Sequence, residues 1–276
     1  MTTIAAVVPI FYPHPSVVEN IKSYAMYVNE VYIIYNSPVA QDIQQKLHDI
    51  KNTRVLYSGE NIGIAKALNL ALNEASINKY HWLLTMDQDS SFEDQFPTFL
   101  THFESISKKN LIIFSPIHNQ KFMQTKTSSI RVSYVMTSGN IVNISYARHI
   151  NGYNEDLFID EVDHEFCFKA KEHKYHIYCD RSIVLTHHLG ESHKHFSTIK
   201  LYPPIRLYYM VRNYLYLRQW YRRTQTKFFQ KRDKYLLTLM CKQMIFGRQK
   251  KDNLIKILQA IKDYKKQIYG EYPYAS

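Results

Sequence analysis

Cysteine is scarce in this sequence of 276 residues, which has three cysteines. Cys167, Cys179 and Cys241 are odd in number and lack the C-x-x-C spacing that is typical of structural zinc sites and disulfide frameworks. We therefore expect reduced thiols in a cytosolic protein.

Long apolar runs are also missing. No stretch reaches the roughly 18 to 20 apolar residues that span a bilayer. The start, MTTIAAVVPIFYPHP, has neither a basic n-region nor a long apolar h-region. We expect a chain that is neither exported nor membrane-spanning, with peripheral attachment to the inner face of the cell membrane left open. Internal repeats and low-complexity linkers are absent as well, which favours one large α/β domain, alone or with an appendage.

Acidic residues are outnumbered by basic ones, 24 against 35, and the formal charge is +11. This excess favours an anionic partner: nucleic acid, a phosphorylated small molecule or an anionic lipid surface. The basic charge belongs mainly to residues 206–266. With 45% hydrophobic and 14% aromatic residues the chain is globular. The 23 tyrosines suit sugar-binding sites, protein cores and membrane interfaces alike.

Strands and helices alternate in the first third of the chain. Short apolar runs at Ile4–Ile10, Val31–Tyr35 and Arg54–Tyr57 predict buried strands, and helical spacing at Val17–Val28 and Gln41–Ile50 separates them. This βαβαβ order predicts a parallel sheet with helices on both faces, whose ligand site lies at the carboxyl ends of the strands.

Later segments extend this Rossmann-like sheet and add a helical extension. A helix is expected to begin near Asn61-Ile62-Gly63, and further strands are expected at His81–Thr85 and Leu111–Ser115. The segment Val132–Ile144 is expected to form two strands joined by a Ser-Gly-Asn turn. We expect residues 1–200 to form the nucleotide-sugar-binding and catalytic domain, and residues 201–276 a basic, aromatic-rich helical extension packed on it with a basic aromatic face exposed. The predicted helices of the extension are 206–223, 228–246 and 253–269.

Two carboxylates follow one of these strands directly. Asp87 and Asp89 flank a single residue, so in an extended segment their side chains point the same way and share one cation. Mg²⁺ and Mn²⁺ prefer carboxylate ligands and complete their shells with water and phosphate oxygens. Such an ion would neutralise a departing diphosphate. An Asp-x-Asp by itself is also a common solvated turn, but its position after a buried strand favours the metal.

A second acidic cluster surrounds Leu157-Phe158-Ile159. Six carboxylates fall within residues 154–165, which is unfavourable near apolar residues unless they bind cations, hydroxyls or a protonated partner. A general base fits here. The structural alternative is an acidic helix N-terminus with Asp160 as N-cap.

Two shorter signals remain. Thr137-Ser138-Gly139-Asn140 places small residues where the backbone approaches something closely, or is merely a turn. His187 and His188 follow a predicted strand. An imidazole at that position has three alternative roles: a third metal ligand, a phosphate contact or a structural residue.

In their order and spacing these segments resemble the inverting family 2 glycosyltransferases with the GT-A fold, most closely the bacterial rhamnosyltransferase group. The resemblance spans about residues 4 to 215. It rests on the following motifs: Val8-Pro9-Ile10-Phe11-Tyr12, Asn61-Ile62-Gly63-Ile64-Ala65-Lys66-Ala67-Leu68-Asn69, Leu84-Thr85-Met86-Asp87-Gln88-Asp89-Ser90, Thr137-Ser138-Gly139-Asn140, Leu157-Phe158-Ile159-Asp160-Glu161-Val162-Asp163, His188-Leu189-Gly190 and Arg206-Leu207-Tyr208-Tyr209-Met210-Val211-Arg212-Asn213.

The resemblance implies that the nucleotide-sugar donor binds over the first strands, with Mn²⁺ or Mg²⁺ on Asp89 and Asp87 and His188 as a further ligand. In relatives, the Asn that ends the second strand usually follows an Asp that contacts the nucleotide base. Here Tyr35 replaces that Asp, so the resemblance does not decide whether the base is uracil or thymine. The expected donor-binding residues are Pro9, Phe11, Asn36, Asn61, Lys66, Asp87, Gly139, Asn140 and Arg212.

The family's acidic pair falls at Asp160-Glu161, so the resemblance implies that Asp160, then Glu161, then Asp163 is the candidate for the catalytic base. This carboxylate would take the proton of an acceptor hydroxyl in a single in-line displacement that inverts the anomeric centre. The metal, with His188 or Arg212, would stabilise the leaving diphosphate and an oxocarbenium-like transition state.

The resulting hypothesis is a hexosyltransferase that extends a lipid-linked cell-surface polysaccharide. L-rhamnose from dTDP-rhamnose is the first candidate donor, and a UDP-hexose or UDP-galactofuranose is the alternative. The basic, aromatic segment 208–223 suits anionic headgroups or is a solvated helical face.

Two other function classes compete with this hypothesis. A nucleic-acid-binding protein would use the basic tail but leaves both acidic clusters without a role, so no nucleic-acid partner is expected. A nucleotidyltransferase often has a glycine-rich phosphate loop after the first strand, and residues 9–16 contain no glycine.

Overall fold

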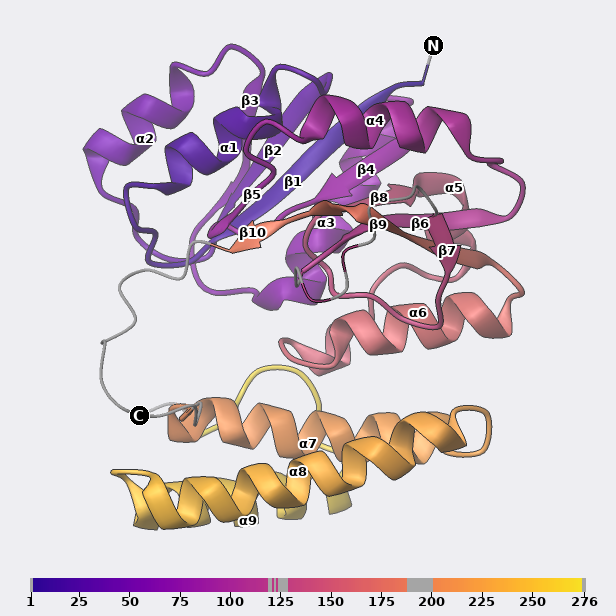
Figure 1. The fold of residues 1–276 in the computed structure, drawn as a ribbon. Coiled ribbons are helices and arrows are strands. Elements are labelled where there is room, and N and C mark those ends of the chain that lie inside the picture. Colours follow the sequence, from indigo (N-terminus) through magenta and orange to yellow (C-terminus); the bar gives the residue numbers. More distant parts are fainter. Residues whose placement is uncertain (1, 119–120, 122, 124–128, 188–200, 275–276) are drawn as a thin grey trace.

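The computed structural model describes residues 2–118, 121, 123, 129–187 and 201–274. Its centre is an eight-stranded sheet in the order β3-β2-β1-β4-β8-β6-β9-β7, in which β1 to β4 are mutually parallel, β6 pairs parallel with β9, and β7 and β8 run antiparallel to their neighbours (Figure 1). The strands are β1 Ile4–Ile10, β2 Glu30–Tyr35, β3 Thr53–Ser58, β4 Trp82–Thr85, β6 Leu111–Ile117, β7 Ser129–Arg131, β8 Asn140–Asn143 and β9 His176–Val184.

Helices cover both faces of this sheet, as the alternation in the sequence predicts. Apolar residues of α1, α2 and α4 form one core with the first face, and those of α3, α5 and α6 form a second core with the other face. The helices are α1 Val17–Ala25, α2 Gln41–His48, α3 Gly63–Ile77, α4 Phe96–Ser105, α5 Ile144–His149 and α6 Val162–Glu172, with a 3₁₀ turn, η2, at Glu155–Leu157.

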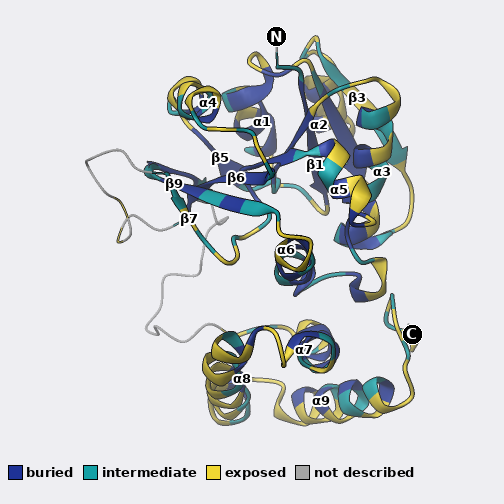
Figure 2. Ribbon diagram, turned by 90° about the vertical axis from the view of Figure 1, so that its right-hand side faces the viewer, coloured by how far each residue is buried: buried dark blue, intermediate teal, exposed yellow. Residues whose placement is uncertain are grey.

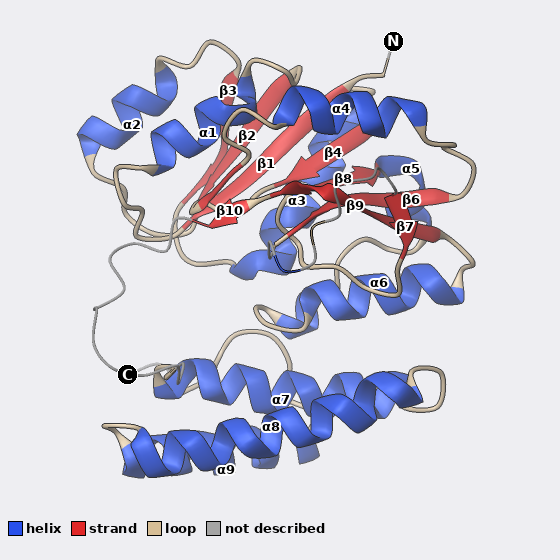
Figure 3. Ribbon diagram, in the orientation of Figure 1, coloured by secondary structure: helices blue, strands red, loops and turns tan. Residues whose placement is uncertain are grey.

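Three long helices form a further layer below α6 (Figure 3). They are α7 Pro204–Tyr221, α8 Thr226–Phe246 and α9 Lys250–Lys265. Their shared core also includes Phe158 and Phe168, so this layer packs on the segment that leads into α6 and on α6 itself. No helix in the described part of the chain is long and apolar enough to cross a membrane.

The structure corrects the expected exposed aromatic face of the extension. The tyrosines of α7 are buried, and α7 is largely dark blue in the burial colouring of Figure 2, whereas α8 is mostly yellow. Their rings pack on one another and on α9, because a tyrosine buries its ring when its hydroxyl finds a partner, as Tyr208 does on Asp263. The buried tyrosines are Tyr208, Tyr209, Tyr214, Tyr216 and Tyr221.

The predicted strand, turn, strand unit at 132–144 is also wrong in its first half. Residues 132–139 form no strand, and β7, which ends before them, pairs with β9 instead of β8. The segment is held at the end of β4, where Thr85 Oγ1 donates to the carbonyl of Thr137 (2.5 Å) and Gly139 N donates to the carbonyl of Thr85 (2.7 Å). Pairing with β4 therefore replaces the expected hairpin.

Candidate functional site

The loop that carries Asp87 and Asp89 is fastened to the end of β1 by the residue between them. Gln88 Oε1 accepts from Phe11 N (2.8 Å), and Gln88 Nε2 donates to the carbonyl of Phe11 (2.9 Å). Asn20 Nδ2 also donates to the carbonyl of Gln88 (2.9 Å). Because both hydrogen-bonding groups of the amide are used, the two half-buried carboxylates have a fixed backbone at the carboxyl edge of the sheet.

The Thr-Ser-Gly-Asn segment supports the same loop from the other side. Ser138 Oγ accepts from Asp87 N (2.9 Å). Gly139 has φ +82°, and a Cβ there would lie 2.7 Å from Pro116 Cγ, so this position requires glycine. Asn140 is buried, and its Oδ1 has no hydrogen-bond partner among the described residues, whereas its Nδ2 donates to the carbonyl of Met136 (2.7 Å).

The predicted nucleotide-binding residues lie along the carboxyl ends of β1 and β2 and at the start of α3. Pro9 is a buried-strand residue paired with Ile34, whereas the Phe11 side chain is 47% exposed. Asn36 Oδ1 accepts from Ile62 N (3.4 Å), and Asn61 Oδ1 accepts from Gly63 N (3.0 Å). These two asparagines shape the loop before α3, and the Lys66 side chain on α3 is exposed.

His187, the residue before the predicted histidine ligand, belongs to a small second sheet. There β5 (Ser90–Ser91) pairs antiparallel with β10 (Thr186–His187), which sets His187 opposite Ser90, the residue after Asp89. His188 itself lies outside the described residues. Within those residues no group of three or more His, Cys, Asp or Glu is arranged to hold a metal ion, so a cation on Asp87 and Asp89 would take its other ligands from elsewhere.

The segment between η2 and α6 has an unusual backbone. Phe158, Asp160 and Glu161 have φ angles of 61°, 61° and 64°. Residues other than glycine rarely adopt this region of backbone conformation. Asn213 of α7 holds the segment, because its Nδ2 lies 2.6 Å from the carbonyl oxygens of Leu157 and Ile159 and 3.2 Å from that of Asp160. Such strain persists only where surrounding contacts enforce it, and it concentrates at functional sites.

This segment also meets the predicted donor side of the site. The carbonyl of Phe158 accepts from Ile64 N (2.8 Å) and lies 3.4 Å from Ala65 N at the start of α3. The first turn of a helix has free N–H groups, so the Phe158 carbonyl acts as its cap. The Asn61–Asn69 motif and the acidic segment are therefore joined by main-chain hydrogen bonds.

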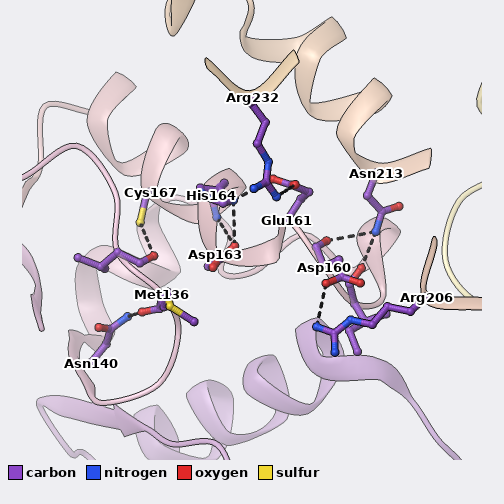
Figure 4. A network of polar contacts seen from close by, with 12 residues as sticks. Met136, Asn140, Asp160, Glu161, Asp163, His164, Cys167, Arg206, Asn213 and Arg232 are labelled. Carbon is purple, nitrogen blue, oxygen red and sulfur yellow. Dashed lines mark hydrogen bonds and ion pairs between the residues drawn. The ribbon is translucent and has the colours of Figure 1, made fainter. Parts of the chain in front are cut away.

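Asp160 is a candidate base with one carboxylate oxygen engaged and the other without a hydrogen bond from the described residues. Its Oδ1 lies 3.1 Å from Arg206 Nη2 of α7, and its Oδ2 is buried without a hydrogen-bond partner among the described residues (Figure 4). Burial raises the pKa of Asp160 above its ordinary value, and Arg206 offsets part of that rise. A carboxylate with a raised pKa and a free oxygen is suited to take up a proton.

Glu161 is held in ion pairs instead. Its Oε1 lies 2.5 Å from Arg232 Nη2 of α8, and its Oε2 lies 2.8 Å from His164 Nδ1. Burial by itself raises the pKa of Glu161, but His164 and Arg232 outweigh it and lower that pKa to about 2. A carboxylate this acidic is a weak base at neutral pH, so Glu161 serves as a fixed anion.

The helix after this segment begins one residue later than predicted. Glu161, in the left-handed region, is the N-cap of α6, and its side chain makes no capping hydrogen bond. The expectation of Asp160 as N-cap is therefore wrong, because the positive φ of both residues delays the first helical turn. Asp163, the third candidate base, is on the first turn of α6, where its Oδ1 accepts from His164 N (2.8 Å).

Arg206 connects the two acidic clusters electrostatically. Burial acts to lower its pKa, but Asp160, and with a smaller effect Asp87, raise that pKa above its ordinary value. Arg212, the predicted donor-binding arginine, has other partners: it is fully buried, with hydrogen bonds to Tyr208, Asn213 and the carbonyl of Gly270. The arginine of α7 that the structure brings toward Asp87 is thus Arg206.

Four residues in these contacts had no assigned role in the sequence analysis: Gln88, Arg206, Asn213 and Arg232. Gln88, Arg206 and Asn213 lie inside motifs named in the sequence analysis, and that position could have indicated that they belong to the site. Arg232 has no local signal, because its partner Glu161 is 71 residues away and only the packing of α8 brings them together.

Comparisons with known proteins agree with this geometry. No family model matches the sequence. The chain is 26% identical over 200 residues to the dTDP-rhamnosyl transferase RfbF of Shigella flexneri, which covers 64% of this chain and 67% of that protein.

The structure is similar to crystal structures of TarS from S. aureus. The complex of TarS residues 1–349 with UDP-GlcNAc has a TM-score of 0.57 at 15% identity, covering 97% of this chain and 82% of that one. The complex with UDP has a TM-score of 0.52 at 13% identity, covering 100% and 95%. The predicted α/β fold of the GT-A type and the resemblance to bacterial family 2 glycosyltransferases are confirmed.

Proposed function

Given a glycosyltransferase with the GT-A fold, we propose that this chain transfers a sugar to a hydroxyl group of a growing, lipid-linked cell-surface polysaccharide with inversion of the anomeric centre. L-rhamnose from dTDP-rhamnose is the first donor to test, since the curated relative is a dTDP-rhamnosyl transferase. A UDP-hexose or UDP-galactofuranose is the second, because TarS has been crystallised with UDP-GlcNAc and UDP.

The observation that carries the proposal is the position of Arg206 between the two acidic clusters. It lies 3.1 Å from Asp160, and the charge of Asp87 acts on its pKa. A diphosphate held at Asp87 and Asp89 and an acceptor hydroxyl at Asp160 would therefore both feel the charge of the same guanidinium. In-line displacement at the anomeric carbon needs the base and the leaving group on opposite sides of one carbon, and a cation between the two acidic clusters suits that requirement.

The donor set at the edge of the sheet fits a hard divalent cation. Asp87 and Asp89 supply carboxylate oxygens from a loop that Gln88 and Ser138 fix in place. Mn²⁺ or Mg²⁺, when bound there, would neutralise charge on the departing diphosphate. His188 stays a predicted further ligand.

The reacting residues of the chain then have separate tasks. Asp160 takes the proton of the acceptor hydroxyl on its free Oδ2 as the hydroxyl oxygen attacks the anomeric carbon. The bond from that carbon to the diphosphate oxygen breaks, and its electron pair leaves with the oxygen. Arg206 holds Asp160 in orientation and adds positive charge beside the leaving group. Glu161 stays ionised and anchors the strained segment on Arg232 and His164.

Binding and hydrolysis of a panel of nucleotide sugars test the proposal. Calorimetric titration with and without Mn²⁺ is expected to show metal-dependent binding of one donor by the wild type and none by Asp89→Ala. Asp94→Ala, an exposed acid five residues along the chain, is the matched control. Failure of every donor to bind the wild type, together with salt-dependent binding of RNA or DNA, would favour the nucleic-acid-binding alternative instead.

Peripheral attachment to the inner face of the cell membrane completes the proposal. A lipid-linked acceptor keeps its carrier in the bilayer, so the enzyme must work at that surface. The basic charge of residues 206–266 supports attraction to anionic headgroups.

A further inference from the structure

The helical layer has an exposed face that mixes large aliphatic side chains with lysines. On α8 and α9, six large apolar residues are between 46% and 60% exposed. We call them the aliphatic face: Leu237, Ile245, Phe246, Leu254, Ile255 and Leu258. Where exposed apolar side chains of this size lie together on one side of a helix, they mark a binding surface.

The charges around the aliphatic face are almost all positive. Eight lysines of α8 and α9 are exposed, against a single exposed acid, Asp252. Leu254 and Leu258 are four residues apart, so they lie on one side of α9, and Lys251, Lys262 and Lys265 fall on that same side at helical spacing. A helix with aliphatic residues flanked by lysines suits the boundary of an anionic bilayer, where the lysine stems lie along the apolar surface and the ammonium groups reach the headgroups.

The turn between α8 and α9 is held by buried amides. Gly247 N donates to the carbonyl of Gln243 (3.0 Å), and Asn253 Nδ2 donates to the same carbonyl (3.3 Å). Both amide side chains are buried. The aliphatic residues on either side of the turn are therefore presented on a defined support.

This turn lies at the end of the helical layer where the candidate site is. Asp233 of α8 meets Arg218 near the end of α7 (3.2 Å), and Asp263 of α9 meets Tyr208 near its start (2.8 Å). The rise of about 1.5 Å per residue then puts Lys250 about 20 Å before Asp263, beyond the start of α7. The start of α7 carries Arg206, the partner of Asp160, and Figure 1 shows both at one end of the layer.

We propose that the aliphatic face of α8 and α9 docks on an anionic lipid bilayer and so holds the site beside the headgroups, where a lipid-linked acceptor arrives. This inference rests on the proposed function, because it names the surface through which that enzyme meets its acceptor. A second copy of the chain is the competing occupant, but a symmetric pairing of this face would bring two sets of lysines together, which is unfavourable.

Vesicle flotation of the full chain tests the surface. Wild-type protein is expected to bind vesicles of phosphatidylcholine mixed with phosphatidylglycerol at least about tenfold more strongly than phosphatidylcholine alone. The double variant Leu254→Asn/Leu258→Asn should lose about tenfold of that binding, since it removes apolar contacts with the bilayer. Ile77→Asn, at an exposed isoleucine on α3, is the matched control and should bind as the wild type does.

Donor hydrolysis in solution is measured on the same preparations. All three proteins should hydrolyse the donor equally, because neither substitution touches the site. Equal vesicle binding by the double variant and the wild type would contradict the assignment of this surface as the membrane-docking face. So would a wild-type dimer, in sedimentation without vesicles, that the double variant abolishes. Vesicle binding without hydrolysis of any donor by any of the proteins would overturn the proposed function and leave the surface standing.

Discussion

Arg206 and Asp160 form an ion pair across the two layers of the molecule, with Nη2 of Arg206 3.1 Å from Oδ1 of Asp160. The arginine occupies one carboxylate oxygen and leaves the other buried without a hydrogen-bond partner in the described part of the chain. An arginine that engages only one oxygen orients the carboxylate and still leaves it able to accept a proton.

Asp160→Asn is expected to lower kcat by about a hundredfold to ten thousandfold, the range typical of a lost general base, with little change in donor affinity. Asp163→Asn is the matched control, because it alters an acid three residues away on the first turn of α6. Steady-state kinetics and calorimetric titration of both variants give the comparison. A larger fall in Asp163→Asn than in Asp160→Asn would move the base to Asp163.

Arg206→Ala is expected to move the acid limb of the kcat profile to higher pH. Burial already raises the pKa of Asp160, and Arg206 lowers it, so removal of the guanidinium lets the pKa rise further. A base is active when deprotonated, and a higher pKa therefore shifts the loss of activity upward in pH. Arg222→Ala, at an exposed arginine that ends the same helix, should leave the profile unchanged. A shift to lower pH would contradict the assignment.

Glu161→Gln is expected to remove an acid-sensitive part of the free energy of unfolding. The pKa of Glu161 is lowered to about 2 from an unfolded value of 4.5, so its stabilising effect is present above pH 4.5 and is lost as pH falls toward 2. The difference corresponds to about 3 kcal/mol. Urea unfolding across this pH range should therefore show a steeper loss in the wild type than in the variant. Parallel curves would show that Arg232 and His164 do not hold Glu161 ionised.

Asn213→Ala is expected to destabilise the chain by about 2 kcal/mol, because it leaves the carbonyls of Leu157, Ile159 and Asp160 without their donor. It should also lower kcat more than it changes the KM for the donor, since it frees the backbone that sets Asp160. Denaturant unfolding and steady-state kinetics measure the two effects. Gln219→Ala, at an exposed position of the same helix, controls for the loss of an amide side chain.

Gly63→Ala and Gly270→Ala separate backbone strain from steric conflict. Both glycines have positive φ, +77° and +73°, so both substitutions cost about 1 kcal/mol of strain. A Cβ at Gly63 would also lie 2.6 Å from Phe158 Cδ2, whereas one at Gly270 meets nothing within 4 Å. Thermal unfolding should therefore show a distinctly larger loss for Gly63→Ala, with weaker donor binding. Equal losses would deny the contact between α3 and the acidic segment.

The sheet was largely predictable from the sequence because its central strands are short, uninterrupted apolar runs. The predicted bounds of β1 are those observed. Those of β2 and β4 differ from the prediction by one residue at one end, and β3 is one residue longer at each end. The strand expected after Val132 does not form, because residues 133–139 join no strand ladder and the end of the segment is set by hydrogen bonds between Thr85 and residues 137 and 139. Local pattern carries no information on such distant partners.

The site was predictable in its residue types but not in its pairings. Asp160 and Glu161 are adjacent in sequence, and only the structure shows that one has a raised and the other a lowered pKa. Their partners, Arg206 and Arg232, come from helices whose packing no local signal describes. The prediction that the α7 tyrosines are exposed was wrong for a related reason. A ring with a polar tip fits a core or a surface equally well, so the sequence pattern alone does not distinguish the two.

The strained backbone at Phe158 to Glu161 has a consequence for the order in which the protein is made. A chain synthesised as far as residue 200 has every strand of the described sheet and both carboxylates of Asp87 and Asp89. It lacks Asn213 and Arg232, so nothing from the helical layer holds the segment that carries Asp160. A nascent chain at that stage already has the elements of the donor side, but the proposed base is held in place only after the helices that carry Asn213 and Arg232 have left the ribosome.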